Sequence, residues 1–293
     1  TLFPIRELSA RTQVNTVTIR AWERRYGLLK PQRTAKGHRL YSEEDVHTIE
    51  KILALIARGV SVGKVKAMLT EVTGLEDKQD MALWQHAITQ LEMATQSYQS
   101  NQLELLIADY FVNYPVSVCR QNLFQPIFIA LQKETASNKA QRSFLEGELL
   151  IYTLRRLKNH HTGMSKLDKA KPPVLLCYGE NTAIWPLLFL CLELADAQVN
   201  VQLINQAVGL DSFVEISQQS RSEITLFYQD GLWSEVQTQL AKKALTEDSS
   251  IVLCGTAAIM AQIDSANSDE GTGNQIFSAL PEFSQYWLSS KHS

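Results

Sequence analysis

The chain contains 293 residues, of which 45% are hydrophobic and 20% are charged, and its formal net charge is −3. This composition excludes an intrinsically disordered protein, and no apolar run reaches the roughly 18 residues that a membrane-spanning helix requires. The length exceeds that of an ordinary single domain, so we expect two or three compact units with separate cores. The N-terminus lacks the charged and apolar regions of a signal peptide, and we expect a cytoplasmic protein without a membrane partner.

The charges are distributed unevenly along the chain. Residues 1–70 contain 13 Lys and Arg against 6 Asp and Glu, a balance of +7, and the remaining residues have a balance of −10. Such a split is typical of a nucleic-acid-binding head attached to a body that does not share this task. The cysteines are widely spaced, with no CxxC pair, and we expect small core residues without a disulfide or metal role at Cys119, Cys177, Cys191 and Cys254.

The basic head begins with two predicted helices. The first starts near Ile5, and the second covers about residues 16–25 after Asn15, whose side chain is a good N-cap. Two short helices joined by a tight turn predict a helix-turn-helix, in which the second helix enters the major groove of DNA. We expect an inward face on this second helix at Val17, Ala21 and Trp22, and an outward face at Thr16, Thr18, Arg20, Arg24 and Arg25.

A basic hairpin is predicted after this helix. Gly27 ends the helix, and "TAKG" forms a turn between two short extended pieces, "KPQR" and "HRLY". Such a hairpin is a wing, from which we expect contacts to the DNA backbone or minor groove by Arg33, Lys36, His38 and Arg39. Ser42 then caps a helix with the stripe Val46, Ile49, Ile52, Leu53 and Ile56, and Ser61 caps one more.

The segment "TVTIRAWERRYGLLKPQRTAKGHRLYSEEDV" resembles the DNA-binding head of the MerR family of bacterial transcription regulators. The resemblance covers about residues 3–70, and it is closest to the curli and biofilm regulators and to the heads of cobalamin-dependent photoreceptor repressors. It implies that Thr18 and Arg20 lie on the recognition helix and that Arg39 and Tyr41 contact backbone phosphate. Trp22 and Tyr26 have two interpretations: they stack on DNA sugars, or they pack the helix against the wing.

The resemblance also implies partners. Family members bind near-palindromic, double-stranded promoter DNA as homodimers, with half-sites about one helical turn apart or a multiple of it. Many bend and untwist the promoter, which is recognition through DNA deformability as well as base contacts. We therefore expect promoter DNA, a second copy of the chain and RNA polymerase as partners, and a small-molecule effector is a further hypothesis.

The middle of the chain predicts a four-helix bundle. Residues 71–80 have the composition of a polar linker, and helical patterns follow at about 80–98, 100–112, 116–134 and 139–160. The photoreceptor subgroup covers its cobalamin with a Trp-x(n)-Glu-His pattern in this region. Ser143 and Phe144 stand about where the Glu-His pair would fall, so this contact to the corrin is not expected.

The C-terminal part predicts a flavodoxin-like doubly wound parallel sheet. Apolar strand-like runs such as "PPVLLCYG" and "SSIVLCG" alternate with helical patterns, as they do when both faces of a parallel sheet are buried. The complete fold class is multidomain α and α/β. It consists of a winged helix-turn-helix (1–72), a four-helix bundle (76–162) and a flavodoxin-like, cobalamin-binding-like domain (172–293), with "SANSDEGTGN" (265–274) as a loop.

Cobalamin-binding domains of this fold carry Asp-x-His-x-x-Gly after the first strand, with the His as a cobalt ligand. Here the matching positions are Glu180, Thr182 and Trp185, so the resemblance implies no cobalamin. Strand-end loops still favour a small ligand such as a cyclic dinucleotide. The predicted pocket comprises Gly179, Glu180, Asn181, Thr182, Gly255 and Thr256.

Two functional classes remain for the body of the chain. It is a ligand sensor that controls the head, or a scaffold that only dimerises or contacts a partner. An enzyme is not expected, because the sequence shows no nucleophile–base pair, metal cluster or phosphate loop. His160 and His161 are adjacent rather than at a metal-ligand spacing.

Overall fold

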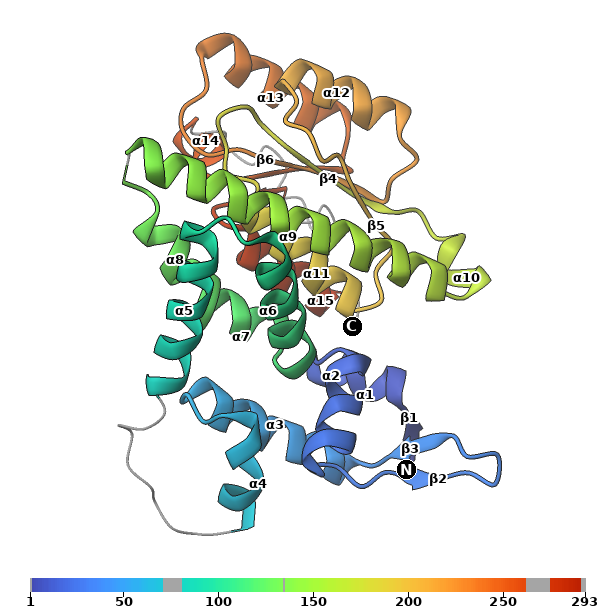
Figure 1. Cartoon of the computed structure of the whole chain (residues 1–293). Coiled ribbons are helices and arrows are strands. Elements are labelled where there is room, and N and C mark those ends of the chain that lie inside the picture. The colour runs from blue at the N-terminus through green and yellow to red at the C-terminus, as the bar shows by residue number, and fades with distance from the viewer. Residues whose placement is uncertain (1, 71–80, 134, 262–274, 291–293) are drawn as a thin grey trace. The chain divides into compact units, whose positions relative to one another are not determined.

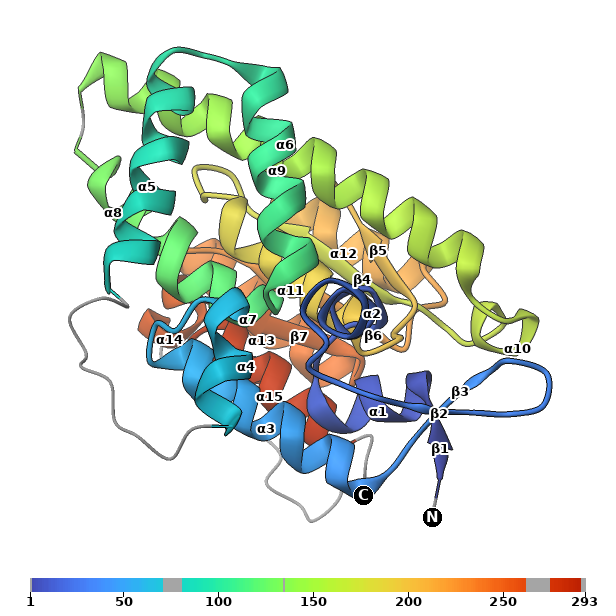
Figure 2. The same ribbon diagram turned by 60° about the horizontal axis from the view of Figure 1, so that its bottom comes forward.

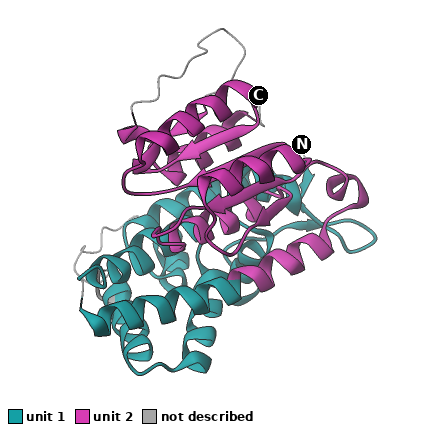
Figure 3. Cartoon of the chain, turned by 90° about the horizontal axis from the view of Figure 1, so that it is seen from above, with its two compact units in different colours: residues 1–152 teal, residues 153–293 magenta. Residues whose placement is uncertain are grey.

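The computed structural model describes residues 2–70, 81–133, 135–261 and 275–290, and the chain divides into two compact units, Thr1–Tyr152 and Thr153–Ser293 (Figure 1 and Figure 3). The boundary falls inside one long helix, α9 (Ala136–Gly163), which is partly teal and partly magenta in Figure 3. The predicted linker at 71–80 and the predicted loop at 265–274 lie outside the described residues. The division into three domains therefore stays a prediction.

The first unit begins with the predicted winged helix-turn-helix. Its sheet has the order β1-β3-β2, with both pairs antiparallel, and the hairpin of β2 and β3 extends away from the helices (Figure 2). Strand β1 was not predicted, because two residues show no periodicity. The elements are β1 (Phe3–Pro4), α1 (Ile5–Thr12), α2 (Thr16–Ala21), the π-helical turn η1 (Trp22–Tyr26), β2 (Gln32–Arg33), β3 (Arg39–Tyr41), α3 (Glu43–Ala57) and α4 (Val62–Thr70).

The ends of these helices follow the capping residues that the sequence shows. The Asn15 side chain accepts hydrogen bonds from the amides of Val17 (2.7 Å) and Thr18 (2.8 Å), so two free amides of the first turn of α2 have an acceptor. Gly27 ends η1 with a φ of 61°, in the left-handed region that favours glycine. At the start of α3, the Ser42 amide donates to the Asp45 carboxylate at 2.8 Å.

The helical middle follows the head in the same unit. The predicted third helix is a series of three consecutive pieces rather than one regular helix. Its core includes Phe111, whose ring stacks with those of Phe124 (5.6 Å between centroids) and Tyr152 (5.1 Å). The elements are α5 (Met81–Gln96), α6 (Ser100–Asn113), α7 (Val116–Cys119), the π-helical turn η2 (Arg120–Phe124), α8 (Gln125–Ala130) and the first part of α9.

The second unit contains a five-stranded parallel sheet with the order β5-β4-β6-β7-β8. This order is that of the flavodoxin-like doubly wound fold, which confirms the prediction. The elements are α10 (Lys166–Lys169), β4 (Val174–Tyr178), α11 (Trp185–Asp196), β5 (Val201–Leu203), α12 (Leu210–Gln219), β6 (Ile224–Tyr228), α13 (Glu235–Glu247), β7 (Ile251–Cys254), α14 (Thr256–Met260), β8 (Ile276–Phe277) and α15 (Leu280–Ser290).

Both faces of this sheet are covered, which explains its continuous apolar strands. On one face, residues such as Leu176 and Leu226 pack with helices α11 and α15. On the other face, Leu175 and Phe227 pack with α12, α13 and α14. Successive residues of a strand point to opposite faces, so a strand that is buried on both is almost entirely apolar, and Thr225 of β6 is a buried exception.

All four cysteines are buried, as the sequence predicts, and each has a free thiol. Burial raises the thiol pKa of Cys177 and of Cys254 to about 12 in each case, so both stay protonated. Among the described residues, no helix is both long and apolar enough to cross a bilayer. The same residues contain no group of three or more His, Cys, Asp or Glu side chains placed to hold a metal ion.

Candidate nucleic-acid interface

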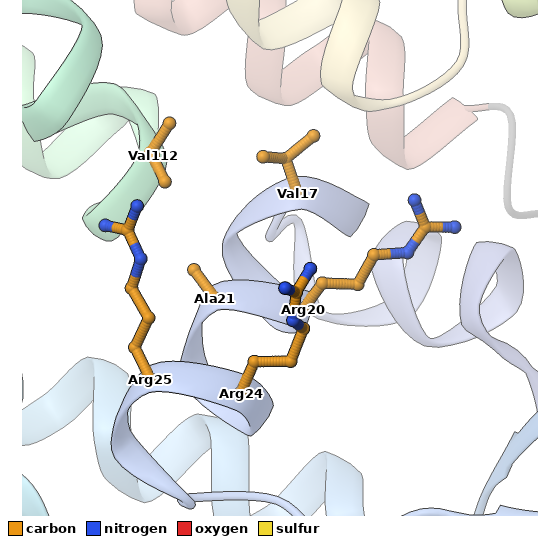
Figure 4. A pocket seen from close by; sticks show the side chains of 6 residues that line it. All are labelled: Val17, Arg20, Ala21, Arg24, Arg25 and Val112. Carbon is orange, nitrogen blue, oxygen red and sulfur yellow. The ribbon is translucent and has the colours of Figure 1, made fainter.

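The predicted DNA-reading surface is centred on α2 and η1, residues 16–26, which we call the reading helix. Arg20, Arg24 and Arg25 are exposed on it, and Thr16 is half-buried. The three arginines line a cavity of about 440 Å³ in the first unit (Figure 4). Long, exposed guanidinium groups on one short helix are suited to phosphate oxygens and guanine edges.

Two positions of the reading helix face the opposite way from the prediction. Val17 was expected to point into the core, but its side chain is 52% exposed. Thr18 was expected to face DNA, but it is fully buried, and its hydroxyl donates to the Phe111 carbonyl at 3.5 Å. The physical reason is the position of α6, which covers the side of the reading helix that carries Thr18 and Trp22.

The wing presents a second basic surface. Arg33, Lys36 and His38 are exposed at or near its turn, in which Gly37 has a φ of 81°. Arg39 is half-buried, and its Nε donates to the Glu23 carboxylate at 2.6 Å. This hydrogen bond is the main reason why the pKa of Arg39 is raised above its ordinary value.

Glu23 is a residue of this surface that the sequence analysis did not select. Its carboxylate accepts from Arg39 and lies 3.5 Å from a terminal nitrogen of Arg33, so one acid of η1 contacts two arginines of the wing. Its side chain is 13% exposed, where an ion pair is screened less than at an open surface. Glu23 therefore fixes the wing relative to the reading helix. The sequence feature that could have identified Glu23 is an acidic residue between Trp22 and two arginines.

Tyr41 lies in the core of the head rather than on its surface. It pairs with Phe3 in the β1–β3 register and is fully buried. Burial, with a smaller contribution from the Glu23 carboxylate, raises the pKa of its hydroxyl to about 12. In this conformation the Tyr41 side chain offers no surface to phosphate, so its predicted contact would require the head to rearrange.

The two aromatic residues of the reading helix contact α6. Trp22 is fully buried, and its Nε1 donates to the Asn113 carbonyl at 2.8 Å. The Tyr26 hydroxyl donates to Oδ1 of Asn113 at 3.0 Å, and partial burial raises its pKa. Of the two interpretations, this arrangement favours packing over stacking on DNA, but the partner is α6 rather than the wing.

A polar cavity of about 210 Å³ lies at the strand ends of the second unit. Two of the predicted pocket residues, Glu180 and Asn181, line it. The other lining residues come from later loops and helix starts, and sequence spacing did not connect them: Val208, Gly209, Leu210, Gln229, Leu232 and Gln237. The end of a parallel sheet where successive connections go to opposite faces is the usual ligand position of this fold.

The remaining predicted pocket residues do not line the cavity, and the two threonines among them bond to neighbouring loop residues. The amide and hydroxyl of Thr256 both donate to the Asp230 carboxylate at 3.1 Å. The Thr182 hydroxyl donates to the Glu180 carbonyl at 3.4 Å. A side chain at Gly255 would place its Cβ 2.4 Å from the Gln229 carbonyl oxygen, and one at Gly179 would clash with the Gln229 side chain.

These residues do not fit cobalamin. The position of the cobalt-ligating histidine holds Thr182, whose hydroxyl donates to the Glu180 carbonyl and accepts from the Asp230 amide, both at 3.4 Å. A threonine has no imidazole nitrogen to serve as a lower ligand to cobalt. The indole of Trp185, at the position of the motif's glycine, packs edge-to-face with Phe189 at 6.1 Å between ring centroids.

Comparison with known proteins shows what the head is similar to. Residues 3–72 match the model of the MerR HTH family regulatory proteins. The chain is 36% identical over 156 residues to the HTH-type transcriptional regulator MlrA of Salmonella typhimurium, and 36% identical over 151 residues to MlrA of Escherichia coli. Both alignments cover 52% of this chain and 60% of the relative, so the chain spans less than two thirds of these relatives.

A third relative extends further along the chain. The HTH-type transcriptional repressor CarH of Myxococcus xanthus is 27% identical over 208 residues, which cover 67% of this chain and 68% of that protein. Similarity to both kinds of relative agrees with the resemblance that the sequence motifs showed.

Proposed function

We propose that this chain, whose residues 3–72 match the MerR HTH family of regulatory proteins, is a sequence-specific, DNA-binding transcriptional regulator of the MlrA-like kind. The observation that carries this proposal is the N-capped reading helix with three exposed arginines, next to a hairpin with exposed Arg33, Lys36 and His38. The similarity to transcription regulators also supports a regulatory role for this chain rather than a catalytic one.

We further propose that two copies bind one near-palindromic promoter site. A single reading helix contacts only a few base pairs, so two symmetric heads supply the affinity and the specificity together. Binding by both heads distorts the duplex, and the sequence between the half-sites contributes through its deformability. The helical and α/β parts then serve dimerisation or effector sensing without cobalamin, and contact with RNA polymerase links binding to transcription.

Selection of duplexes from a random pool, followed by titration of the enriched duplex, tests this proposal. We expect an enriched sequence with two-fold symmetry and half-sites about 10 base pairs apart, or a multiple of this spacing. The selected duplex should bind roughly 10³-fold or more tightly than a scrambled one. Equal affinity for both duplexes at each salt concentration would contradict sequence-specific regulation.

A second function, small-ligand sensing, is favoured by the polar cavity at the strand ends. Glu180, Asn181, Gln229 and Gln237 supply carboxylate and amide groups for a polar ligand. Thermal unfolding with cyclic dinucleotides tests this hypothesis, since a ligand that binds the folded state stabilises it by RT ln(1 + [L]/Kd). An unchanged melting temperature with every ligand favours the scaffold. Adenosylcobalamin is the negative control, for which no corrin absorbance should co-elute with the protein.

A further inference from the structure

The C-terminal end of α6 lies against the reading helix of the same chain, within the first unit. Trp22 Nε1 donates to the carbonyl of Asn113, and the Thr18 hydroxyl donates to the carbonyl of Phe111. Thr18 and Trp22 are fully buried by their surroundings, and Asn113 is 5% exposed. The end of α6 is thus packed against one side of the reading helix.

Asn113 is the centre of this contact. Its Oδ1 accepts from the Tyr26 hydroxyl at 3.0 Å and from an Arg25 guanidinium nitrogen at 3.3 Å. Its Nδ2 donates back to the carbonyl and the carboxylate of Asp109, which holds the amide group in this orientation. The Asp109 carboxylate also lies 3.8 Å from the Arg25 guanidinium.

The groups that α6 presents to the head resemble those of a DNA backbone. The last carbonyls of a helix have no intrahelical partner, and they form the negative end of its dipole. No basic residue lies in the last turn of α6, and Asp109 adds a negative charge. The groups of the head that donate to these acceptors are an arginine, a tyrosine and an indole. They belong to a helix that is suited to bind phosphates and base edges.

The geometry also limits access to the reading helix. Val112 of α6 lines the same cavity as Val17, Arg20 and Arg24, and Figure 4 shows Arg25 extending toward Val112. The major groove of B-DNA is about 12 Å wide and admits one α-helix, so the reading helix cannot enter it while α6 lies against its side.

We propose that the end of α6 is a built-in competitor of DNA, which holds the head in a closed conformation until the reading helix separates from Asn113 and Asp109. This inference rests on the proposed function, because it assumes that the reading helix binds DNA. It goes beyond that function by assigning the closed state to particular groups of α6. An effector or partner that favours separation would increase the affinity for DNA.

The size of the effect follows from the populations of the two states. The apparent dissociation constant is the intrinsic value divided by the fraction of open molecules. If roughly one molecule in ten is open, a variant that abolishes the contact binds DNA about tenfold more tightly. The gain cannot exceed the reciprocal of the open fraction.

Asn113→Ala and Asp109→Asn in the full-length chain test the proposal, with Asn101→Ala as the matched control. Asn101 is an exposed asparagine at the other end of α6. Fluorescence anisotropy with the selected duplex should show roughly five- to tenfold tighter binding for Asn113→Ala and a smaller gain for Asp109→Asn. Asn101→Ala should match the wild type. All three variants leave the arginines of the head unchanged.

The indole N–H of Trp22 gives a second measurement that does not depend on these variants. In the free protein it should exchange slowly with solvent, because it is buried and bonded to the backbone of Asn113. With saturating duplex it should exchange at least tenfold faster, and a Trp22→Phe spectrum assigns the signal. Equally slow exchange with and without DNA would overturn the inference.

The outcomes separate this inference from the function on which it rests. If the wild type binds the selected duplex and Asn113→Ala binds it no more tightly, the competitor role is wrong and the regulator proposal stands. If neither protein prefers any duplex, the regulator proposal fails and the inference fails with it. If Asn113→Ala and Asp109→Asn gain affinity and Asn101→Ala does not, the contact with α6 inhibits binding.

Discussion

The head and the α/β unit use their polar side chains in opposite ways. In the head, the charged groups of Arg20, Arg24 and Lys36 are exposed to solvent. At the strand ends of the α/β unit, Asp230 accepts from the Tyr228 hydroxyl at 2.5 Å and from Thr256. These hydrogen bonds join neighbouring loops to each other. Many polar side chains at this edge of the sheet therefore bond to other groups of the protein.

The fold of the α/β unit and the chemistry of its strand ends are specified by different residues. The sheet is built by apolar residues that point alternately to its two covered faces, and such residues are present from β4 to β7. The residues that would hold a cofactor lie in a few loop positions, and here one of them is Thr182 instead of histidine. A sheet of this kind can keep its architecture after a binding motif has changed. In the head, by contrast, the exposed arginines lie within the segment that matches the MerR HTH family.

The largest effect that we predict concerns the architecture of the α/β unit. Phe227 is 1% exposed, and its ring lies 4.8 Å from that of Phe213 between centroids. Phe227→Ala should lower the free energy of unfolding of this unit by about 3–5 kcal/mol, because it removes buried apolar surface and leaves a cavity. Urea denaturation followed by circular dichroism measures the change.

Val236→Ala in the same unit is the control for this substitution, because Val236 is 79% exposed. It should change the free energy of unfolding by less than about 0.5 kcal/mol. If both variants lose the same stability, the sheet is not the stable scaffold that the comparison assumes. If Phe227→Ala also changes base preference, the two regions are not independent in function.

The second prediction concerns the chemistry of the head. Arg20→Ala should cost roughly 1–3 kcal/mol of discrimination at particular base pairs, because a bidentate arginine distinguishes guanine from other bases. Titrations with the selected duplex and with single-base variants measure it. Lys51→Ala, which removes an exposed positive charge from α3, should leave the base preference unchanged. Equal weakening on every duplex would show that Arg20 does not contact bases.

Local signals in the sequence were sufficient to predict much of the fold. Asn15, Gly27 and Ser42 each end or begin an element through hydrogen bonds or backbone angles that involve only near neighbours. The strands of the α/β unit were recognisable because burial on both faces leaves an unbroken apolar run. Both kinds of signal lie within a few residues of the feature that they determine.

The orientation of side chains on the reading helix could not be predicted in the same way. Val17 and Thr18 exchanged their expected faces because α6, about 90 residues later in the chain, covers one side of the helix. The strand-end cavity shows the same limit, since Glu180 and Asn181 follow the first strand but Gln229 and Gln237 come from later loops and helices. Contacts between elements that are distant in sequence decided both results.

The smallest effect that we predict concerns Arg39, which tests whether a wing arginine that bonds to Glu23 still contacts DNA. A guanidinium has five N–H donors, and the hydrogen bond to Glu23 uses the one on Nε. If Arg39 also contacts one phosphate, Arg39→Ala should weaken binding to every duplex. It should also reduce the slope of log K against log[salt] by about 0.9, because one fewer counterion is released.

Glu23→Gln separates a contact with phosphate from a role in placing the wing. Glu23→Gln keeps Arg39 but removes the negative charge that holds it, so the salt slope should stay within about 0.3 of the wild-type value while base preference declines. Titrations of both variants from low to moderate salt measure the two slopes. If Arg39→Ala leaves the slope unchanged and reduces base preference as Glu23→Gln does, Arg39 is not a phosphate contact. It would then act only by fixing the wing against the reading helix, and the exposed Arg33, Lys36 and His38 would carry the electrostatic part of binding.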